Sequence, residues 1–374
     1  MPAKKKSVIS KASPHTIKKF ELIEEYIKSW AQKLMLNDSC NGLIFIDCMC
    51  NSGIYTDDTG EHVKGTAVRV SEALLEVART YTDKAVYIYL NDKDAERVDE
   101  LEKHLPQNER NFQIVTSRLD AHELLKTIGP QLYQTGHLHY FLLYDPYDAS
   151  IDWEAILPFF LNWGEVMINH MVSDPVRAIT SAKRKTTKEK YENTYLEDFE
   201  KLVPFGSDKT AYEARVEEII ASLHGTRRYY VAAFPFYNTN NSHMYNLIHC
   251  TSHKEGFKLY KKSAWKVFGA QSSTKHSSDN GQLRFDFDGV ITLDTDTSCF
   301  RVRDIAKYLQ DNFRGRNLVP LMELWDLLDD HPIFPSEGYR NEIKKELVSD
   351  YGAKIEQIVR VETNKKEYVI SFSQ

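Results

Sequence analysis

The chain has 374 residues, a formal net charge of −6 at pH 7 and 42% hydrophobic residues, and its mean hydropathy is −0.48. This length can form one large core and a second, smaller one. No apolar run approaches the roughly twenty residues that a membrane-spanning helix needs, and residues 1–6 are too polar for a secretion signal. The acidic balance also argues against charge-driven binding to nucleic acid outside a local basic patch.

The cysteines are few and odd in number. Cys40, Cys48 and Cys50 are close in sequence, Cys250 and Cys299 stand alone, and no pair has the CxxC spacing of a zinc site. We therefore expect reduced, mostly buried thiols in a cytoplasmic protein that uses no metal.

Residues 13–270 alternate between strand-like and helix-like patterns. Ser13 and Pro14 suit the N-cap and the first position of an opening helix. The strands expected after it are 43–46, 85–90, 112–116, 138–144 and 165–169, and the helices 66–80, 95–105, 121–127 and 153–160. Because residues 138–144 are almost wholly apolar, they are typical of a central parallel strand. The alternation predicts a doubly wound α/β sheet.

A helix at 211–223 and two further strands, 229–234 and 244–251, follow this sheet. A polar loop at 238–243 joins the two strands. A late hairpin appended to a parallel sheet predicts the Rossmann-like topology of class I methyltransferases, in which the last strand is antiparallel.

Both ends of the chain differ from this pattern. Residues 1–12 are basic and are expected to form a disordered arm, and residues 271–299 a linker or hairpin. Residues 300–374 contain three expected helices, 302–313, 318–328 and 336–349, and two expected strands, 355–361 and 367–372. This order predicts a small winged-helix-like α+β domain.

Four of the expected strands end in an acidic residue: Asp47, Asp92, Asp120 and Asp145. Parallel strands bring their carboxyl ends to one edge of a sheet, where α/β folds bind ligands. Asp47 would hold an amino or ribose group of a nucleotide-like ligand, and Gly53 would let the backbone pass close to it. An ordinary strand-to-helix turn is the alternative interpretation of this stretch.

The next two acids suit other parts of such a ligand. Asp92 could accept hydrogen bonds from both ribose hydroxyls, as the acid of dinucleotide-binding folds does. Asp120 could accept one from the exocyclic amine of adenine. Both positions also precede expected helices, so helix capping remains an alternative for each.

Asp145, Pro146 and Tyr147 follow the expected central strand. Aspartate accepts a hydrogen bond, proline fixes the backbone and exposes a carbonyl, and tyrosine offers a flat face for stacking. Together they could grip an amino group on a planar ring, as in enzymes that draw a base out of its stack. A plain turn is the alternative.

Two basic groups are candidates for nucleic-acid contact. Lys183, Arg184 and Lys185 form a cluster that could follow phosphates, with a solvated helix face as the alternative. Arg340 and Lys344 lie on the last expected helix of the C-terminal domain. Acidic residues are interleaved there, so a contact with protein or a purely structural role is the alternative.

These residues together resemble a known family, the three-Cys-motif partner proteins, over roughly residues 13–265. The resemblance rests on His15, Thr16, Lys18, Tyr26, Trp30, Phe45, Ile46, Asp47, Gly53, Tyr55, Gly65, Thr66, Ala67, Asp145, Pro146 and Tyr147. It implies a class I fold that binds S-adenosylmethionine, a partner that carries the three cysteines, and a bacterial mobile or defence-like locus. Asp47 and Gly53 match the family's cofactor loop, and Asp145 to Tyr147 its presumed catalytic loop.

The chain departs from the family at the cofactor loop. Met49, Cys50 and Asn51 replace phenylalanine, alanine and the first glycine of the family form, and Asp148 replaces a glycine. Asparagine tolerates left-handed backbone angles, so Asn51 is expected to preserve the turn and to lie against the cofactor's methionine part.

Three hypotheses follow for the function. The first is a methyltransferase that uses S-adenosylmethionine to modify an amino group of a nucleobase. The second is a binding module that has lost turnover and recruits a partner protein or DNA through its C-terminal domain. The third is a nuclease or transcription regulator centred on that domain. The oligomeric state stays open.

Overall fold

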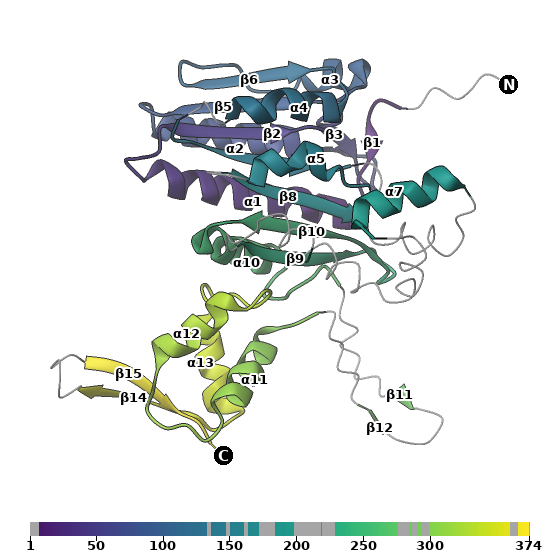
Figure 1. Cartoon of the computed structure of the whole chain (residues 1–374). Helices are drawn as coiled ribbons and strands as arrows, with labels where there is room; N and C mark the ends of the chain where they lie inside the picture. The colour runs from purple at the N-terminus through teal and green to yellow at the C-terminus, as the bar shows by residue number, and fades with distance from the viewer. Residues whose placement is uncertain are drawn as a thin grey trace. The chain divides into compact units, whose positions relative to one another are not determined.

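Figure 1 shows the computed structural model of the chain. The structure describes residues 7–132, 136–146, 150–160, 164–171, 184–197, 218, 229–275, 284–285, 291–292, 299–359 and 366–373. The chain divides into two compact units, Met1–Leu259 and Tyr260–Gln374. The expected helix at 211–223, Tyr147 and Lys183 lie outside the described residues.

The first unit is built on a seven-stranded sheet with the order β6-β5-β2-β7-β8-β10-β9. Its strands are β2 (Gly42–Asp47), β5 (Ala85–Asn91), β6 (Phe112–Ser117), β7 (Leu138–Tyr144), β8 (Gly164–Met171), β9 (Tyr230–Tyr237) and β10 (His243–Thr251). All neighbours up to β8 pair in parallel, whereas β10 is antiparallel to both β8 and β9. This confirms a mixed α/β unit with a large, mostly parallel sheet, consistent with the Rossmann-like methyltransferase fold.

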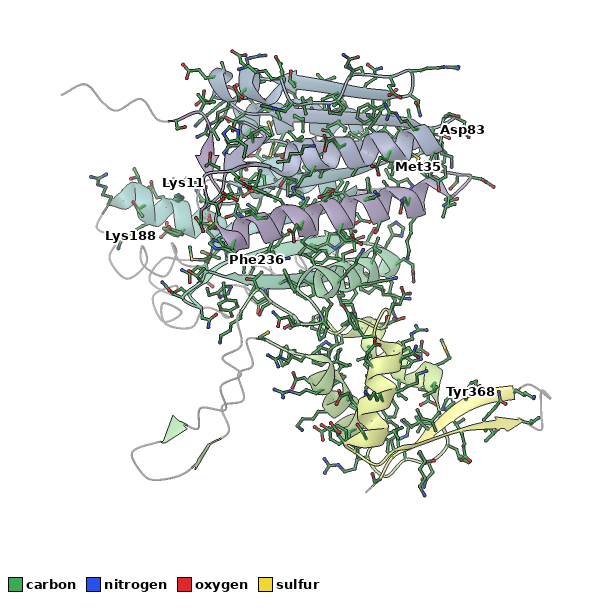
Figure 2. All side chains as sticks on the ribbon, turned by 180° about the vertical axis from the view of Figure 1, so that it is seen from behind. Lys11, Met35, Asp83, Lys188, Phe236 and Tyr368 are labelled. Carbon is green, nitrogen blue, oxygen red and sulfur yellow. The ribbon has the colours of Figure 1, made fainter. Side chains whose placement is uncertain are left out.

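Helices cover both faces of this sheet (Figure 1). They are α1 (Pro14–Met35), α2 (Thr66–Thr80), α3 (Ala95–Leu101), α4 (Ala121–Leu132), α5 (Trp153–Ile156), α7 (Lys185–Tyr195) and α10 (Lys254–Val267). On one face, the rings of Tyr26 and Trp30 in α1 pack against Phe141 of β7. Figure 2, seen from behind, shows α1 running along this face to Met35. On the other face, Leu142 and Ile168 share a core with residues of α4, α5 and α7.

Several boundaries differ from the sequence prediction. The helix expected at 153–160 is α-helical only to Ile156 and continues as a 3₁₀ helix over Leu157–Phe160. The helix expected at 95–105 ends at Leu101. These shorter ends fit the general rule that helix termini depend on local packing and are the least predictable part of an element.

A small sheet beside the main one was not predicted. It contains β1 (Ser10–Lys11), β3 (Ile54–Thr56) and β4 (His62–Lys64), so the residues of β1 are not disordered as expected. The turn between β3 and β4 is held by the Asp57 carboxylate, which accepts hydrogen bonds from the amides of Thr59 and Glu61, both at 2.9 Å. An aspartate followed by Gly60 is a turn signal that the sequence already carried.

The second unit begins within α10, and its described part contains three further helices and a three-stranded sheet. The helices are α11 (Val302–Phe313), α12 (Leu321–Asp330) and α13 (Arg340–Ser349), and the sheet order is β13 (Val319–Pro320), β15 (Lys366–Ser371), β14 (Lys354–Val359). The helix expected at 318–328 starts later because Val319 and Pro320 pair with β15. The helix expected at 336–349 starts at Arg340, after Gly338 with a φ of 90°. In the expected linker, β11 (Arg284–Phe285) pairs with β12 (Ile291–Thr292).

Two expectations from composition can be compared with the structure. In the described part of the chain, no helix has the length and apolar character needed to cross a membrane. All five cysteines are free thiols, and four of them, Cys40, Cys48, Cys50 and Cys250, are buried. The prediction that the thiols are mostly buried is confirmed.

Candidate functional site

Three of the four strand-end acids meet at one edge of the main sheet. Asp47 ends β2, the strand that lies between β5 and β7. Asp92 and Asp145 each come two residues after the position that pairs with Asp47 in the neighbouring strand. They therefore flank Asp47 from both sides, as the sequence predicted.

The protonation of Asp47 reflects this clustering. Its side chain is only 2% exposed, and burial raises its pKa to about 7, with the charges of Asp145 and Asp92 adding to the increase. A hydrogen bond from the Met49 amide and the charge of Lys19 act in the opposite direction. Carboxylates this close to one another disfavour simultaneous ionisation, so this edge of the sheet favours a ligand with positive charge.

The loop after β2 closes on its neighbours through backbone hydrogen bonds. The Cys50 amide donates to the Asn91 carbonyl at 2.8 Å, and the Asn51 amide donates to Asp92 Oδ2 at 3.1 Å. Asn51 has a φ of 58°, so the expectation that asparagine preserves the left-handed turn is confirmed. Its side-chain oxygen accepts from the Ser52 amide at 2.7 Å, which fixes the side chain within the loop.

Gly53 is required by packing inside the protein. It has a φ of 70°, and a Cβ atom there would lie 2.3 Å from Leu101 Cδ1 and 2.9 Å from Val68 Cγ2. The close approach expected at this glycine is therefore to side chains of α3 and α2. Such helix–strand packing is one of the roles that glycines have in nucleotide-binding turns.

The helix-capping role that the sequence left open for Asp92 belongs to Asp94, two residues later. Asp94 caps α3 by accepting from the Glu96 amide at 3.1 Å. Asp92 is 2% exposed, and its two oxygens accept from the amides of Asn51 and Asp94 at 3.1 and 2.9 Å. The Arg97 guanidinium also lies 3.8 Å from Asp92 Oδ2, so Asp92 combines backbone donors with a nearby cation.

Asp120 differs from the three clustered acids in its exposure to solvent. It is exposed, and its Oδ1 accepts from the His122 amide at 3.0 Å at the start of α4. This is the geometry of a helix cap, the alternative that the sequence left open.

Asn91 is a site residue that the sequence analysis gave no role. It is fully buried, and its side-chain amide donates to the carbonyls of Cys48 and Leu119, both at 3.0 Å. Its Oδ1 accepts from Ser117 Oγ and the Leu119 amide. Asn91 thus links the loops after β2, β5 and β6. Its position at a strand end, next to an acidic residue, could have identified it from the sequence.

Two side chains hold Asp145 among the residues that the structure describes. Lys19 Nζ lies 2.6 Å from Oδ2, and Asn169 Nδ2 donates to Oδ1 at 2.6 Å. Lys19 comes from α1 and is 7% exposed, and its ammonium also lies 5.3 Å from the centre of the Tyr245 ring. Pro146 is buried directly after this aspartate.

Lys19, Asn169 and Tyr245 were not predicted as site residues. Asn169 lies at the end of an apolar strand, the same pattern that identified the four acids, and its Oδ1 has no hydrogen-bond partner in the part of the chain that the structure describes. Tyr245 Oη donates to the His15 carbonyl at 3.1 Å. Burial raises the pKa of this tyrosine well above its usual value.

The basic candidates are placed differently. Arg184 precedes α7 as its N-cap residue, and Lys185 lies 3.4 Å from Glu189 with both side chains largely exposed. Arg340 packs over the Trp325 ring at 5.2 Å and donates through Nε to the Ser336 carbonyl at 2.7 Å. Its guanidinium therefore has partners within the second unit. Lys344 lines a surface pocket of that unit.

Comparisons with known proteins leave the family open. No protein-family model and no curated protein matches the chain. Among solved structures, the chain is similar to a loganic acid methyltransferase with SAH, at 10% sequence identity and a TM-score of 0.27 over 70% of this chain and 87% of that chain. A TM-score this low supports no conclusion about this chain.

Proposed function

We propose that the first unit is an S-adenosylmethionine-dependent methyltransferase that modifies an amino group of a nucleobase. The observation that carries the proposal is the cluster of Asp47, Asp92 and Asp145 at adjacent strand ends of a Rossmann-like sheet. The chemistry of this cluster fits the cofactor, because S-adenosylmethionine carries both an ammonium and a sulfonium cation. These three carboxylates, of which Asp47 and Asp92 are buried, provide the matching negative charge beside Lys19 and Arg97.

In this proposal the residues of the β2 and β5 loops hold the cofactor. Asp47 accepts from its amino group, and Asp92 accepts from the ribose hydroxyls. Asn51 and Gly53 shape the loop around the methionine part, and Asp120 accepts from the adenine amine. The bound cofactor supplies a methyl group that its sulfonium makes reactive.

The β7 end would orient the acceptor. Asp145, fixed by Lys19 and Asn169, accepts a hydrogen bond from the amino group that is to be methylated. This bond directs the lone pair of the amino nitrogen toward the methyl group of the cofactor. Pro146 would bind the same amino group through its backbone carbonyl, and Tyr147 would stack on the base. Catalysis then comes mainly from orientation and from fixed polar groups around the moving charge.

Titration calorimetry with S-adenosylmethionine tests this assignment. We expect the wild-type chain to bind, and Asp47→Asn to weaken binding at pH 8 by about tenfold or more, since one ionic contact is lost. Asp94→Asn is the matched control, because asparagine also caps helices and Asp94 is outside the cluster. No binding at millimolar ligand by a folded wild-type chain would contradict the proposal.

A second candidate function is a binding module without turnover. Two observations favour it: backbone amides already engage both oxygens of Asp92, and Leu101 and Val68 fill the space beside Gly53. In this case the C-terminal unit, which we propose is winged-helix-like from its three helices and β-hairpin, would recruit a three-Cys-motif protein or DNA. This candidate would be established if the folded protein does not bind S-adenosylmethionine but still binds such a partner.

A further inference from the structure

The second unit contains a surface groove between α13 and the hairpin of β14 and β15. Its volume is about 530 Å³, which is within the usual size range of ligand sites. The groove is lined by Leu321, Asn341, Lys344, Lys345, Val348, Ser349, Ile355 and Tyr368. Figure 2 labels Tyr368 on the hairpin.

The walls of the groove present unusually exposed apolar side chains. Val348 of α13 is 47% exposed and Tyr368 of β15 is 56% exposed. Strand register places Ile355 opposite Ile370 and Gln357 opposite Tyr368, so the hairpin presents Ile355 and Tyr368 on the same face. Contiguous apolar surface of this kind marks an interaction site more often than isolated exposed residues do.

Two lysines add positive charge to the apolar groove. Lys344 and Lys345 both line it, and neither forms an ion pair with any residue that the structure describes. Cations without an internal partner are available to an external one. Apolar walls beside two free ammonium groups are complementary to a segment that combines apolar and acidic side chains.

We propose that this groove docks a segment of a partner protein in which apolar side chains are interspersed with carboxylates. The apolar side chains pack against Val348, Ile355 and Tyr368, and the carboxylates pair with Lys344 and Lys345. Burial of the apolar side chains provides most of the affinity. The ion pairs at the rim give orientation and a dependence on salt.

Charge on α13 favours protein over DNA. Glu342 and Glu346 lie on the same helix as the two lysines, and a hydrogen bond and the charge of Asp350 raise the pKa of Glu346. A DNA backbone carries a charge at every nucleotide and needs an extended basic surface, whereas a few peptide carboxylates can each pair with one lysine of the groove, which neither glutamate lines. Arg340, the remaining basic residue of α13, is already engaged with Trp325 and the Ser336 carbonyl.

Fluorescence anisotropy of the full chain with a labelled peptide tests the ionic half of the proposal. The peptide is a twelve-residue repeat of aspartate, leucine and phenylalanine, and we expect Lys344→Glu with Lys345→Glu to weaken its binding by about tenfold or more. Lys354→Glu is the matched control, because Lys354 is an exposed lysine of the same hairpin that does not line the groove. That control should bind within about twofold of the wild type.

A second pair of variants tests the apolar half. The double variant Val348→Ser with Tyr368→Ser should also weaken binding of the peptide by about tenfold. Met322→Ser is the control and should leave peptide binding unchanged, because the Met322 side chain is 57% exposed and lies outside the groove. All six substituted positions are at least partly exposed, and circular dichroism checks that each variant folds.

Three outcomes would overturn the inference. The first is that the peptide does not bind at about 1 mM. The second is that the Lys354 control loses as much peptide affinity as the double lysine variant. The third is that a DNA duplex binds through Lys344 and Lys345 and the peptide does not. Because the groove is separate from the three clustered acids, none of these results depends on whether the first unit binds S-adenosylmethionine.

Discussion

The acids at the ends of β5 and β7 are held in different ways. Asp92 accepts from two backbone amides at 3.1 and 2.9 Å, with the Arg97 guanidinium farther away at 3.8 Å. Among the described residues, Asp145 instead pairs with the side chains of Lys19 and Asn169, both at 2.6 Å. Backbone amides are fixed by the chain, while a lysine or asparagine side chain can rotate and give its place to a ligand. We therefore expect the β5 end to be the more rigid of the two, and the β7 end to be the one where a ligand can displace a side-chain partner.

Asp47, between the two ends, provides the largest expected effect. The folded protein holds the Asp47 proton up to about pH 7, and the unfolded chain releases it near pH 4. Because the native state binds the proton more tightly, this stabilisation is complete below about pH 4 and is lost as the pH rises to 7. Asp47→Asn should therefore be more stable than the wild type at pH 8 by about 4 kcal/mol and nearly equal at pH 4.

Urea unfolding at several pH values measures this difference, with Asp94→Asn as the control that should follow the wild type. A stability difference between Asp47→Asn and the wild type that does not change with pH would mean that Asp47 is ionised in the folded protein. The acids would then be less crowded than the structure shows.

Removing Asp145 should have the next largest effect, because it leaves the Lys19 ammonium buried without its carboxylate. We expect Asp145→Ala to lower the free energy of unfolding by about 3 kcal/mol. Adding Lys19→Met should restore most of this loss, and chemical denaturation of the single and double variants measures the coupling. Equal losses in the presence and absence of Lys19 would show that the two side chains are not paired.

At the β5 end, Asp92→Ala removes the acceptor of two amides. We expect a loss of about 2 kcal/mol, since the amides of Asn51 and Asp94 lose their partners. Substitution of Lys19 should not rescue this variant, in contrast to Asp145→Ala. Rescue by Lys19→Met would contradict the division between backbone and side-chain partners.

The smallest effect is expected at Asp120, which is exposed at the start of α4. Loss of the cap in Asp120→Ala should cost about 1 kcal/mol, whereas Asp120→Asn should be nearly neutral because asparagine also caps helices. Thermal unfolding separates the two variants. Because we also propose that Asp120 accepts from the adenine amine, Asp120→Ala should in addition weaken S-adenosylmethionine binding, which calorimetry measures.

The sequence predicted the sheet well because its signals are local. Apolar strands that end in acids, and the helices between them, identified β2, β5, β6, β7 and β8 and placed Asp47, Asp92 and Asp145 at one edge. The left-handed angle at Asn51 was also predictable from residue type. These features depend on short segments and on the direction that parallel strands share.

Contacts between distant segments could not be predicted in the same way. Lys19 is 126 residues from Asp145 in sequence, and nothing in the helix pattern around Lys19 indicates which acid it meets. Arg340 looked available for DNA, but packing against Trp325 engages it. Val319 and Pro320 were expected in a helix because their pairing partner, β15, lies about fifty residues later.

Hydrogen exchange measured by mass spectrometry, with and without S-adenosylmethionine, tests the central claim most directly. If Asp47, Asp92 and Asp145 face one cofactor site, added ligand should slow exchange by about tenfold or more in all three segments, 47–53, 91–95 and 144–146. Unchanged exchange in these segments at saturating ligand, or protection confined to other parts of the chain, would contradict the account.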